Sequence, residues 1–184
     1  MLQKVFINRT LNLRKIKYIG LDMDHTLVRY NTQAFEELAY QGMLTKLVSE
    51  KSYPKEVLEL KFKFHSVIRG LIVDSVRGNL LKVSRHGAIR ASRHGTKSIS
   101  FQQQQKDYRG TYVDLGSPDF SSIDTAFSLS VAILFGQLVD LKDSKPLEYP
   151  EYAQLLKDIV EVMDMSHRDD SLKSVVRDNK EKYI

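Results

Sequence analysis

A short apolar run, residues 16–21 (IKYIGL), ends directly in the sequence DMDHT at residues 22–26. Short runs rich in β-favouring residues are typical of buried parallel strands. Open α/β sheets bind their ligands just outside the carboxyl ends of such strands. We therefore predict a buried strand from Ile16 to Leu21 and a reactive group at Asp22 and Asp24.

Two carboxylates that are two residues apart can divide the work of phosphoryl transfer. One can attack phosphorus and help to hold Mg²⁺, while the other protonates the leaving oxygen and then activates water. Such pairs also arise by chance in a chain with 23 acidic residues, and most of them are simply solvated. The apolar run before the pair, Thr26 and the apolar residues 27–28 favour phosphoryl transfer over a chance pair.

The rest of the chain reads as helices on either side of a set of short strands. Apolar spacing and proline positions predict four helices, at Ala34 to Ser49, after Tyr53-Pro54, at Ser121 to Leu141 and at Glu151 to Met165. From Leu71 to Ser100, β-favouring segments separated by glycine-bearing turns predict a β-meander. Gln102 to Gln105 is expected to form a loop.

The charge of the chain indicates an anionic partner. Lys and Arg number 28 against 23 acids, a net charge of +5. The stretch from Ser75 to Lys106 contains no acid and holds Arg77, Lys82, Arg85, Arg90, Arg93, Lys97 and Lys106. A basic nucleic-acid-binding or non-catalytic interaction module is therefore an alternative, although no zinc finger or aromatic RNP pattern supports nucleic acid.

Location and redox chemistry are limited by what the chain lacks. Without Cys, the chain has neither a disulfide nor a thiolate metal site. Its longest apolar run, Leu129 to Leu138, is too short to span a bilayer, so no membrane span is expected. The basic, acid-free start up to Leu21 is compatible with a mitochondrial presequence, but it continues into an apolar run, so the cytoplasm is the expected location.

Residues 22–27 (DMDHTL) resemble the first signature motif, D-x-D-x-T-L/V, of the haloacid dehalogenase superfamily. Further segments are similar, in the same order, to the cytosolic purine 5′-nucleotidases that prefer IMP and GMP. These segments are residues 5–11 (VFINRTL), 69–74 (RGLIVD), 78–83 (GNLLKV), 125–127 (TAF), 138–140 (LVD) and 171–173 (SLK).

The resemblance implies an α/β protein with a Rossmann-like core, of which only the first strand region is present, and an inserted α+β cap that contains the meander and helices. Residues 1–33 would form the first part of the core with the catalytic motif. Residues 34–175 would form the cap, and residues 176–184 would return toward a core that is missing.

The resemblance also implies roles for particular residues in a Mg²⁺-dependent removal of the 5′-phosphate from purine nucleoside monophosphates. Asp22 would be the nucleophile that forms an aspartyl-phosphate, Asp24 the acid and base, and both would bind magnesium. Substrate-binding positions of the family match Phe127, Asp164, His167 and Lys173. Two positions depart from the family, because Val160 stands in place of an Arg and Ser128 in place of an Asn.

A complete active site of this superfamily needs three further loops, which supply a Ser or Thr, a Lys and a later acidic pair. The chain is therefore expected to be the amino-terminal part of such an enzyme, and to be inactive or nearly so and marginally stable alone. A short regulatory fragment that binds a full-length partner is a further hypothesis, and a homo-oligomer is compatible with the sequence.

Overall fold

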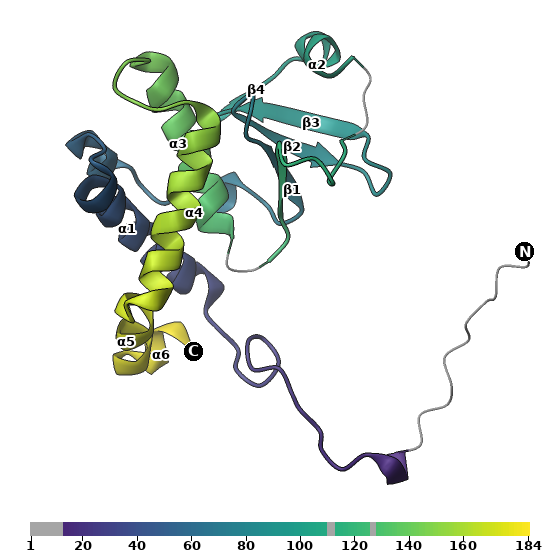
Figure 1. Ribbon diagram of the computed structural model, residues 1–184, viewed down its shortest axis with the longest axis vertical. Coiled ribbons are helices and arrows are strands. Elements are labelled where there is room, and N and C mark those ends of the chain that lie inside the picture. The colour runs from purple at the N-terminus through teal and green to yellow at the C-terminus, as the bar shows by residue number, and fades with distance from the viewer. Residues whose placement is uncertain (1–12, 110–112, 126–127) are drawn as a thin grey trace, which may run out of the picture. The chain divides into compact units, whose positions relative to one another are not determined.

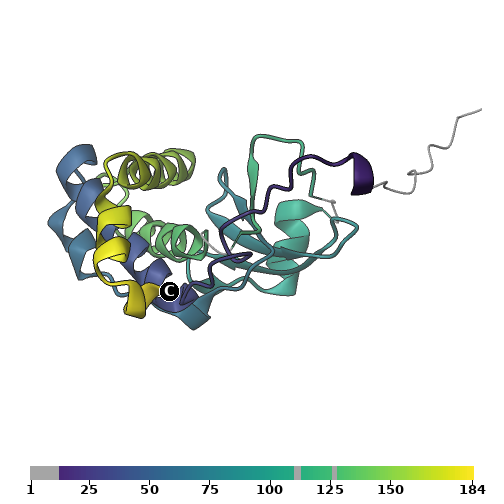
Figure 2. The same ribbon diagram turned by 90° about the horizontal axis from the view of Figure 1, so that it is seen from below.

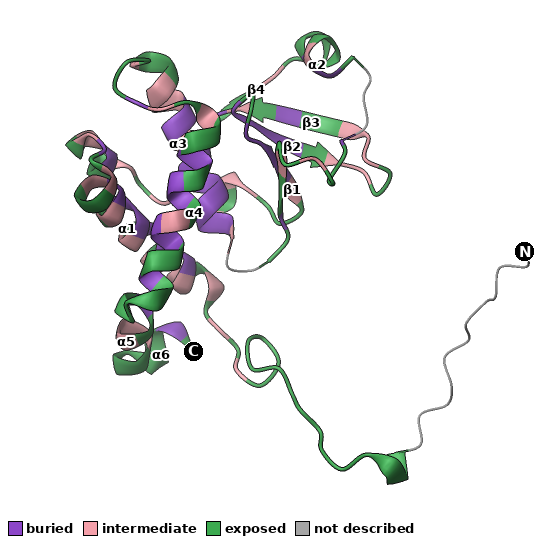
Figure 3. Ribbon diagram, in the orientation of Figure 1, coloured by how far each residue is buried: buried purple, intermediate pink, exposed green. Residues whose placement is uncertain are grey.

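The computed structural model describes residues 13–109, 113–125 and 128–184, in two compact units that divide after Tyr30. The first unit contains a 3₁₀ turn, η1 (Leu13–Lys15), followed by irregular chain and a tight turn near residues 24–28. The strand predicted over residues 16–21 is wrong, because this segment forms no strand and Tyr18 and Ile19 are exposed (Figure 3). A parallel strand is held by hydrogen bonds to neighbouring strands, and the sheet of the described chain pairs none with this segment.

The second unit, from Asn31 onward, consists of a helical part and a small sheet. The helices are α1 (Thr32–Lys51), α2 (Phe101–Tyr108), α3 (Leu129–Ser144), α4 (Tyr152–Arg168), α5 (Ser171–Asp178) and α6 (Lys180–Tyr183), with 3₁₀ turns η2 (Lys55–Glu59) and η3 (Phe64–Ser66). The strands are β1 (Leu71–Asp74), β2 (Asn79–Val83), β3 (Ile89–His94), β4 (Lys97–Ser98) and β5 (Phe120–Ile123).

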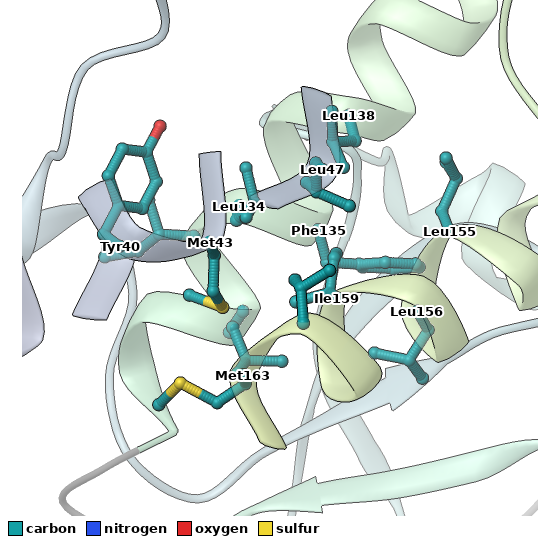
Figure 4. Packing of buried hydrophobic residues seen from close by; sticks show 14 of the residues in the cluster. Tyr40, Met43, Leu47, Leu134, Phe135, Leu138, Leu155, Leu156, Ile159 and Met163 are labelled. Atoms are coloured by element: carbon teal, nitrogen blue, oxygen red, sulfur yellow. The ribbon is translucent and has the colours of Figure 1, made fainter. Parts of the chain in front are cut away.

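The helices α1, α3 and α4 pack against one another and hold the main hydrophobic core (Figures 1 and 4). The side chains at the centre of this core are Tyr40, Met43, Leu47, Leu134, Phe135, Leu138, Leu155 and Ile159. Most of α3 is buried, including every residue from Leu129 to Gly136, which makes it the central helix of the group. Among the helices of the described residues, none is both long and apolar enough to cross a membrane.

The sheet is antiparallel, with the strand order β4-β3-β2-β1-β5, and it lies beside the helical part (Figure 2). Paired residues share a face, so Val73 and Leu80 both join the helical core. Their neighbours Ile72 and Leu81 point to the opposite face, where they pack with Tyr108 of α2 in a second cluster. The sheet is therefore covered on one face by α3 and on the other by α2.

The helices predicted for residues 34–49 and 151–165 and the β-meander are confirmed. Helix α1 begins where the side chain of Asn31 accepts a hydrogen bond from the Ala34 backbone N–H at 3.3 Å. It ends at Ser52, which adopts the left-handed conformation (φ 58°) just before Pro54. Local capping and apolar spacing therefore agree in this part of the chain.

Three other predictions are wrong, either wholly or in part. The helix predicted after Tyr53-Pro54 is only the five-residue 3₁₀ turn η2, followed by extended chain. The loop predicted at Gln102 to Gln105 is helical, because Ser100 caps α2 and the buried Gln104 accepts from the Ser92 hydroxyl at 3.0 Å. The first residues of the helix predicted at Ser121 form β5, where pairing with β1 overrides the helical spacing.

Candidate active site

The DMDHT segment forms a closed turn by bonding to its own backbone. The N–H groups of Thr26, Leu27 and Val28 all donate to the carbonyl oxygen of Met23, at 3.3, 3.0 and 2.9 Å. At the centre of the turn, His25 takes a left-handed backbone conformation with φ 56°. The turn is thus formed by neighbouring residues, and it exposes the side chains of Asp22 and Asp24.

The two aspartates of this turn are exposed, and each is held by one hydroxyl group. The Thr26 hydroxyl donates to Asp22 Oδ2 at 3.5 Å, and the Tyr30 hydroxyl donates to Asp24 Oδ1 at 2.9 Å. Partial burial, together with this bond to the Asp24 carboxylate, raises the pKa of Tyr30. Tyr30 therefore remains a hydrogen-bond donor that restrains Asp24.

The donor chemistry of this turn fits a hard divalent cation. Mg²⁺ is usually bound through one or two carboxylates, with water and substrate phosphate oxygens completing the shell. Asp22 and Asp24 supply two such carboxylates on one exposed turn. Within residues 13–109, 113–125 and 128–184, no cluster of three or more acidic or histidine side chains offers an all-protein metal cage. Asp22 and Asp24 are thus the side chains of this turn that could hold such a cation.

The predicted substrate positions on α4 lie on its exposed side. Asp164 and His167 are three residues apart and so neighbour each other on the helix surface. Asp164 lies 3.8 Å from Arg168 Nη2, and His167 Nδ1 lies 2.9 Å from the Met163 carbonyl oxygen. Val160, four residues before Asp164, is 45% exposed on the same side.

The other two predicted substrate positions are placed differently. Lys173 lies on α5, where it is exposed. Phe127 lies outside the described residues. Among the described positions, the structure therefore brings Asp22 together with Asp24 on one turn, and Asp164 together with His167 on one helix.

Sequence reasoning did not identify two further residues, Tyr30 and Glu36. Tyr30 restrains Asp24, and no pattern in the sequence marks it. Glu36 is fully buried, and its carboxylate accepts from the Leu129 and Ser130 backbone N–H groups at 3.1 and 2.8 Å, at the start of α3. The sequence does mark Glu36, because this acidic residue stands three and four positions before Ala39 and Tyr40, on the buried side of the helix.

The similarity of this chain to known proteins covers most of its length. Residues 5–184 match the model of the 5′ nucleotidase family. A 5′-nucleotidase domain-containing protein of Dictyostelium discoideum is 40% identical over 81 residues, which cover 44% of this chain and 14% of that protein. Human 5′-nucleotidase domain-containing protein 1 is 30% identical over 132 residues, which cover 66% of this chain and 29% of that protein.

In each case the match covers less than a third of the relative. The family model, by contrast, spans this chain from Val5 to its last residue and includes the turn with Asp22 and Asp24. The chain belongs to the 5′-nucleotidase family.

Proposed function

We propose that the protein is a cytoplasmic, magnesium-dependent phosphohydrolase that removes the 5′-phosphate from purine nucleoside monophosphates such as IMP and GMP. The observation that carries the proposal is the exposed turn that presents Asp22 and Asp24 together, in a chain that belongs to the 5′-nucleotidase family. Exposure matters because a carboxylate must reach phosphorus to attack it.

In the proposed reaction, the two carboxylates act in sequence. An oxygen of Asp22 attacks phosphorus, the bond from phosphorus to the 5′-oxygen breaks, and Asp24 gives its proton to the leaving nucleoside. Asp24, now ionised, takes a proton from water. The resulting hydroxide attacks phosphorus of the aspartyl-phosphate, which releases inorganic phosphate and restores Asp22.

The hydroxyl groups around the turn suit these roles. Thr26 donates to one oxygen of Asp22, and Tyr30 donates to one oxygen of Asp24. Each bond restrains the carboxylate while its second oxygen remains available. Asp22 and Asp24 would hold Mg²⁺, which when bound offsets the negative charge of the phosphate as Asp22 approaches it.

The nucleoside part of the proposal rests on four positions that resemble those of the purine-specific enzymes. Phe127 and His167 are proposed to contact the purine, with Asp164 and Lys173 lining the nucleotide site. A lysine suits a phosphate and an aromatic side chain suits a base. Asp164 and His167 share the exposed side of α4, which is compatible with contact to one ligand.

The test is phosphate release from IMP and GMP, with Mg²⁺ and with chelator, by the protein that carries this chain. We expect Asp22→Asn to lower kcat at least about a thousandfold, because the amide oxygen is a poor nucleophile. Asp107→Asn, at a half-buried position of α2, changes the charge equally and should leave kcat unaltered. Unchanged activity of Asp22→Asn, or equal activity in chelator, would contradict the proposal.

A further inference from the structure

A groove lies between the segment of residues 59–67, the turn that joins β3 to β4, and helix α3. Its volume is about 590 Å³. A smaller cavity of about 210 Å³ adjoins it and shares Ser66, Val67, Leu80 and Arg93 with it. We name the two together the basic groove. Figure 1 shows α3 running beside the end of the sheet where β3 and β4 meet.

The floor of the basic groove is apolar. It is formed by side chains from the segment, from β2 and from α3, namely Leu60, Val67, Leu80, Ala132, Ile133 and Leu141. Ala132 and Ile133 are buried, so this surface is part of the folded core rather than a loose flap. An apolar body placed here would lose contact with water on one side, which favours its binding.

Cationic side chains surround this floor because of the extended shape of the segment. Successive side chains of an extended chain point to opposite sides. Leu60, Phe62 and Phe64 accordingly pack against the core, whereas Lys61 and Lys63 between them are exposed. Both lysines line the groove.

The sheet contributes two further cations to the groove, both from the acid-free basic stretch. Lys82 of β2 pairs with Ala91, and Arg93 of β3 pairs with Leu80. Because Leu80 and Lys82 are two residues apart in β2, Lys82 and Arg93 lie on the same face of the sheet. The Arg93 guanidinium donates to the Ser66 carbonyl oxygen at 2.7 Å, which ties β3 to the segment. It keeps further N–H groups that can donate to a ligand.

Little negative charge offsets these cations. In the part of the chain that the structure describes, no carboxylate oxygen lies within 4.0 Å of the ammonium group of Lys61, Lys63 or Lys82. Two acids line the groove. Asp140 is engaged by the backbone N–H and the hydroxyl group of Thr96, and Glu59 is exposed.

We propose that the basic groove binds a small organic anion, with its apolar body on the floor of the groove and its anionic group at Lys61 and Lys63. The proposal is independent of the phosphohydrolase activity, since none of Asp22, Asp24, Asp164, His167 or Lys173 lines the groove. It also favours a small ligand over nucleic acid. The other exposed arginines of the basic stretch, Arg77, Arg85 and Arg90, line neither cavity, so the groove offers no long cationic track.

The experiment measures binding of anilinonaphthalene sulfonate (ANS) to the 184-residue chain by fluorescence titration. We expect one saturable site, and binding about fivefold weaker in Lys61→Ala/Lys63→Ala, since each partly screened charge contributes modestly. The matched control, Lys97→Ala/Lys106→Ala, removes two exposed charges that lie in the basic stretch but outside the groove, and should bind ANS like the unmodified chain. The uncharged parent, N-phenylnaphthylamine, should bind at least about fivefold more weakly than ANS.

A second readout locates the bound probe. On addition of ANS, backbone amide signals of Lys61, Thr96 and Gln137 should shift in nuclear magnetic resonance spectra, while those of α5 should not. The proposal is overturned if the two double variants weaken ANS binding equally, if the uncharged parent binds as tightly as ANS, or if the shifts fall outside the groove or spread over the whole chain.

Discussion

Glu36 shows how one buried charge organises the start of α3. Its side chain is fully buried, and it accepts from the first N–H groups of a helix that lies more than ninety residues further along the chain. Burial raises the pKa of the Glu36 carboxyl, and the bonds from Leu129 and Ser130 act in the opposite direction. The carboxylate completes the helix end that the Ser128 side chain leaves uncapped.

Replacing Glu36 tests this role. Glu36→Ala should lower the free energy of unfolding by about 2–4 kcal/mol, because two buried N–H groups lose their acceptor. Glu36→Gln keeps one oxygen acceptor of the same shape and should lose less. Urea denaturation followed by circular dichroism measures both. Equal stability of Glu36→Ala and the unmodified chain would show that water replaces the carboxylate without loss.

Asp169 makes stability depend on pH in the acid range. Hydrogen bonds from Lys46 at 2.5 Å and from Ser171 lower the pKa of its carboxyl from 3.8 to about 2. The unfolded chain therefore takes up this proton before the folded chain does. The contribution is fully present above pH 3.8 and disappears as the pH falls through about 2.

The variant Asp169→Asn should flatten this dependence. Its stability should change less than that of the unmodified chain between pH 3.8 and about 2, and should be lower at neutral pH. Thermal denaturation at several pH values provides the measurement, with Asp107→Asn as the comparison, because that side chain lies on α2 away from Lys46. An unaltered acid profile in Asp169→Asn would rule out this linkage.

The sheet and α3 approach each other closely at two glycines, Gly95 in the turn after β3 and Gly136 in α3. Gly95, in the turn after β3, has φ 56°, and a Cβ atom there would lie 2.3 Å from Asp140 Oδ1 and 3.0 Å from the Gly136 carbonyl oxygen. Beside it, His94 joins the same elements, since its ring nitrogens lie 2.8 Å from Asn79 Oδ1 and 2.9 Å from Asp143 Oδ2. Sheet and helix are thus held in one arrangement.

Gly95→Ala should therefore be more harmful than a glycine replacement without neighbours. We expect it to lower the free energy of unfolding by about 2–4 kcal/mol, from backbone strain and overpacking together. Gly70→Ala is the matched control, since Gly70 also has a positive φ (82°) but open space around it, and should cost about 1 kcal/mol. Equal losses in urea denaturation would show that α3 can move away without cost.

The individual elements were predictable where local pattern and tertiary environment agree. The spacing of apolar residues indicated α1 and α4, and glycine-bearing turns indicated the meander. The pattern failed at β5 and α2, where residues distant in sequence decide the outcome. Phe120 to Ile123 pairs along β1, and Gln104 of α2 is buried by contact with Ser92 of β3.

At the scale of the molecule, two hydrophobic clusters hold the second unit together, one on each face of the sheet. The larger cluster joins α1, α3 and α4 to Val73 and Leu80, and the smaller one joins Tyr108 to Ile72 and Leu81. The basic groove lies at the edge of the larger cluster, where the segment before β1 crosses beside α3. The proposed ligand site thus arises from how the elements are assembled, and no single element contains it.

The candidate site at Asp22 and Asp24 could be singled out from sequence because the turn that carries it is built from neighbouring residues. Asp22, Thr26 and the Met23 carbonyl lie within five residues, so consecutive backbone bonds form the turn. The burial of Glu36, the pairing of β5 with β1 and the approach of Lys61 to Arg93 in one groove join residues that are 30 to more than 90 positions apart. Such contacts form only when the free energy gained in folding exceeds the entropy cost of closing long loops. Short-range sequence patterns therefore do not predict them.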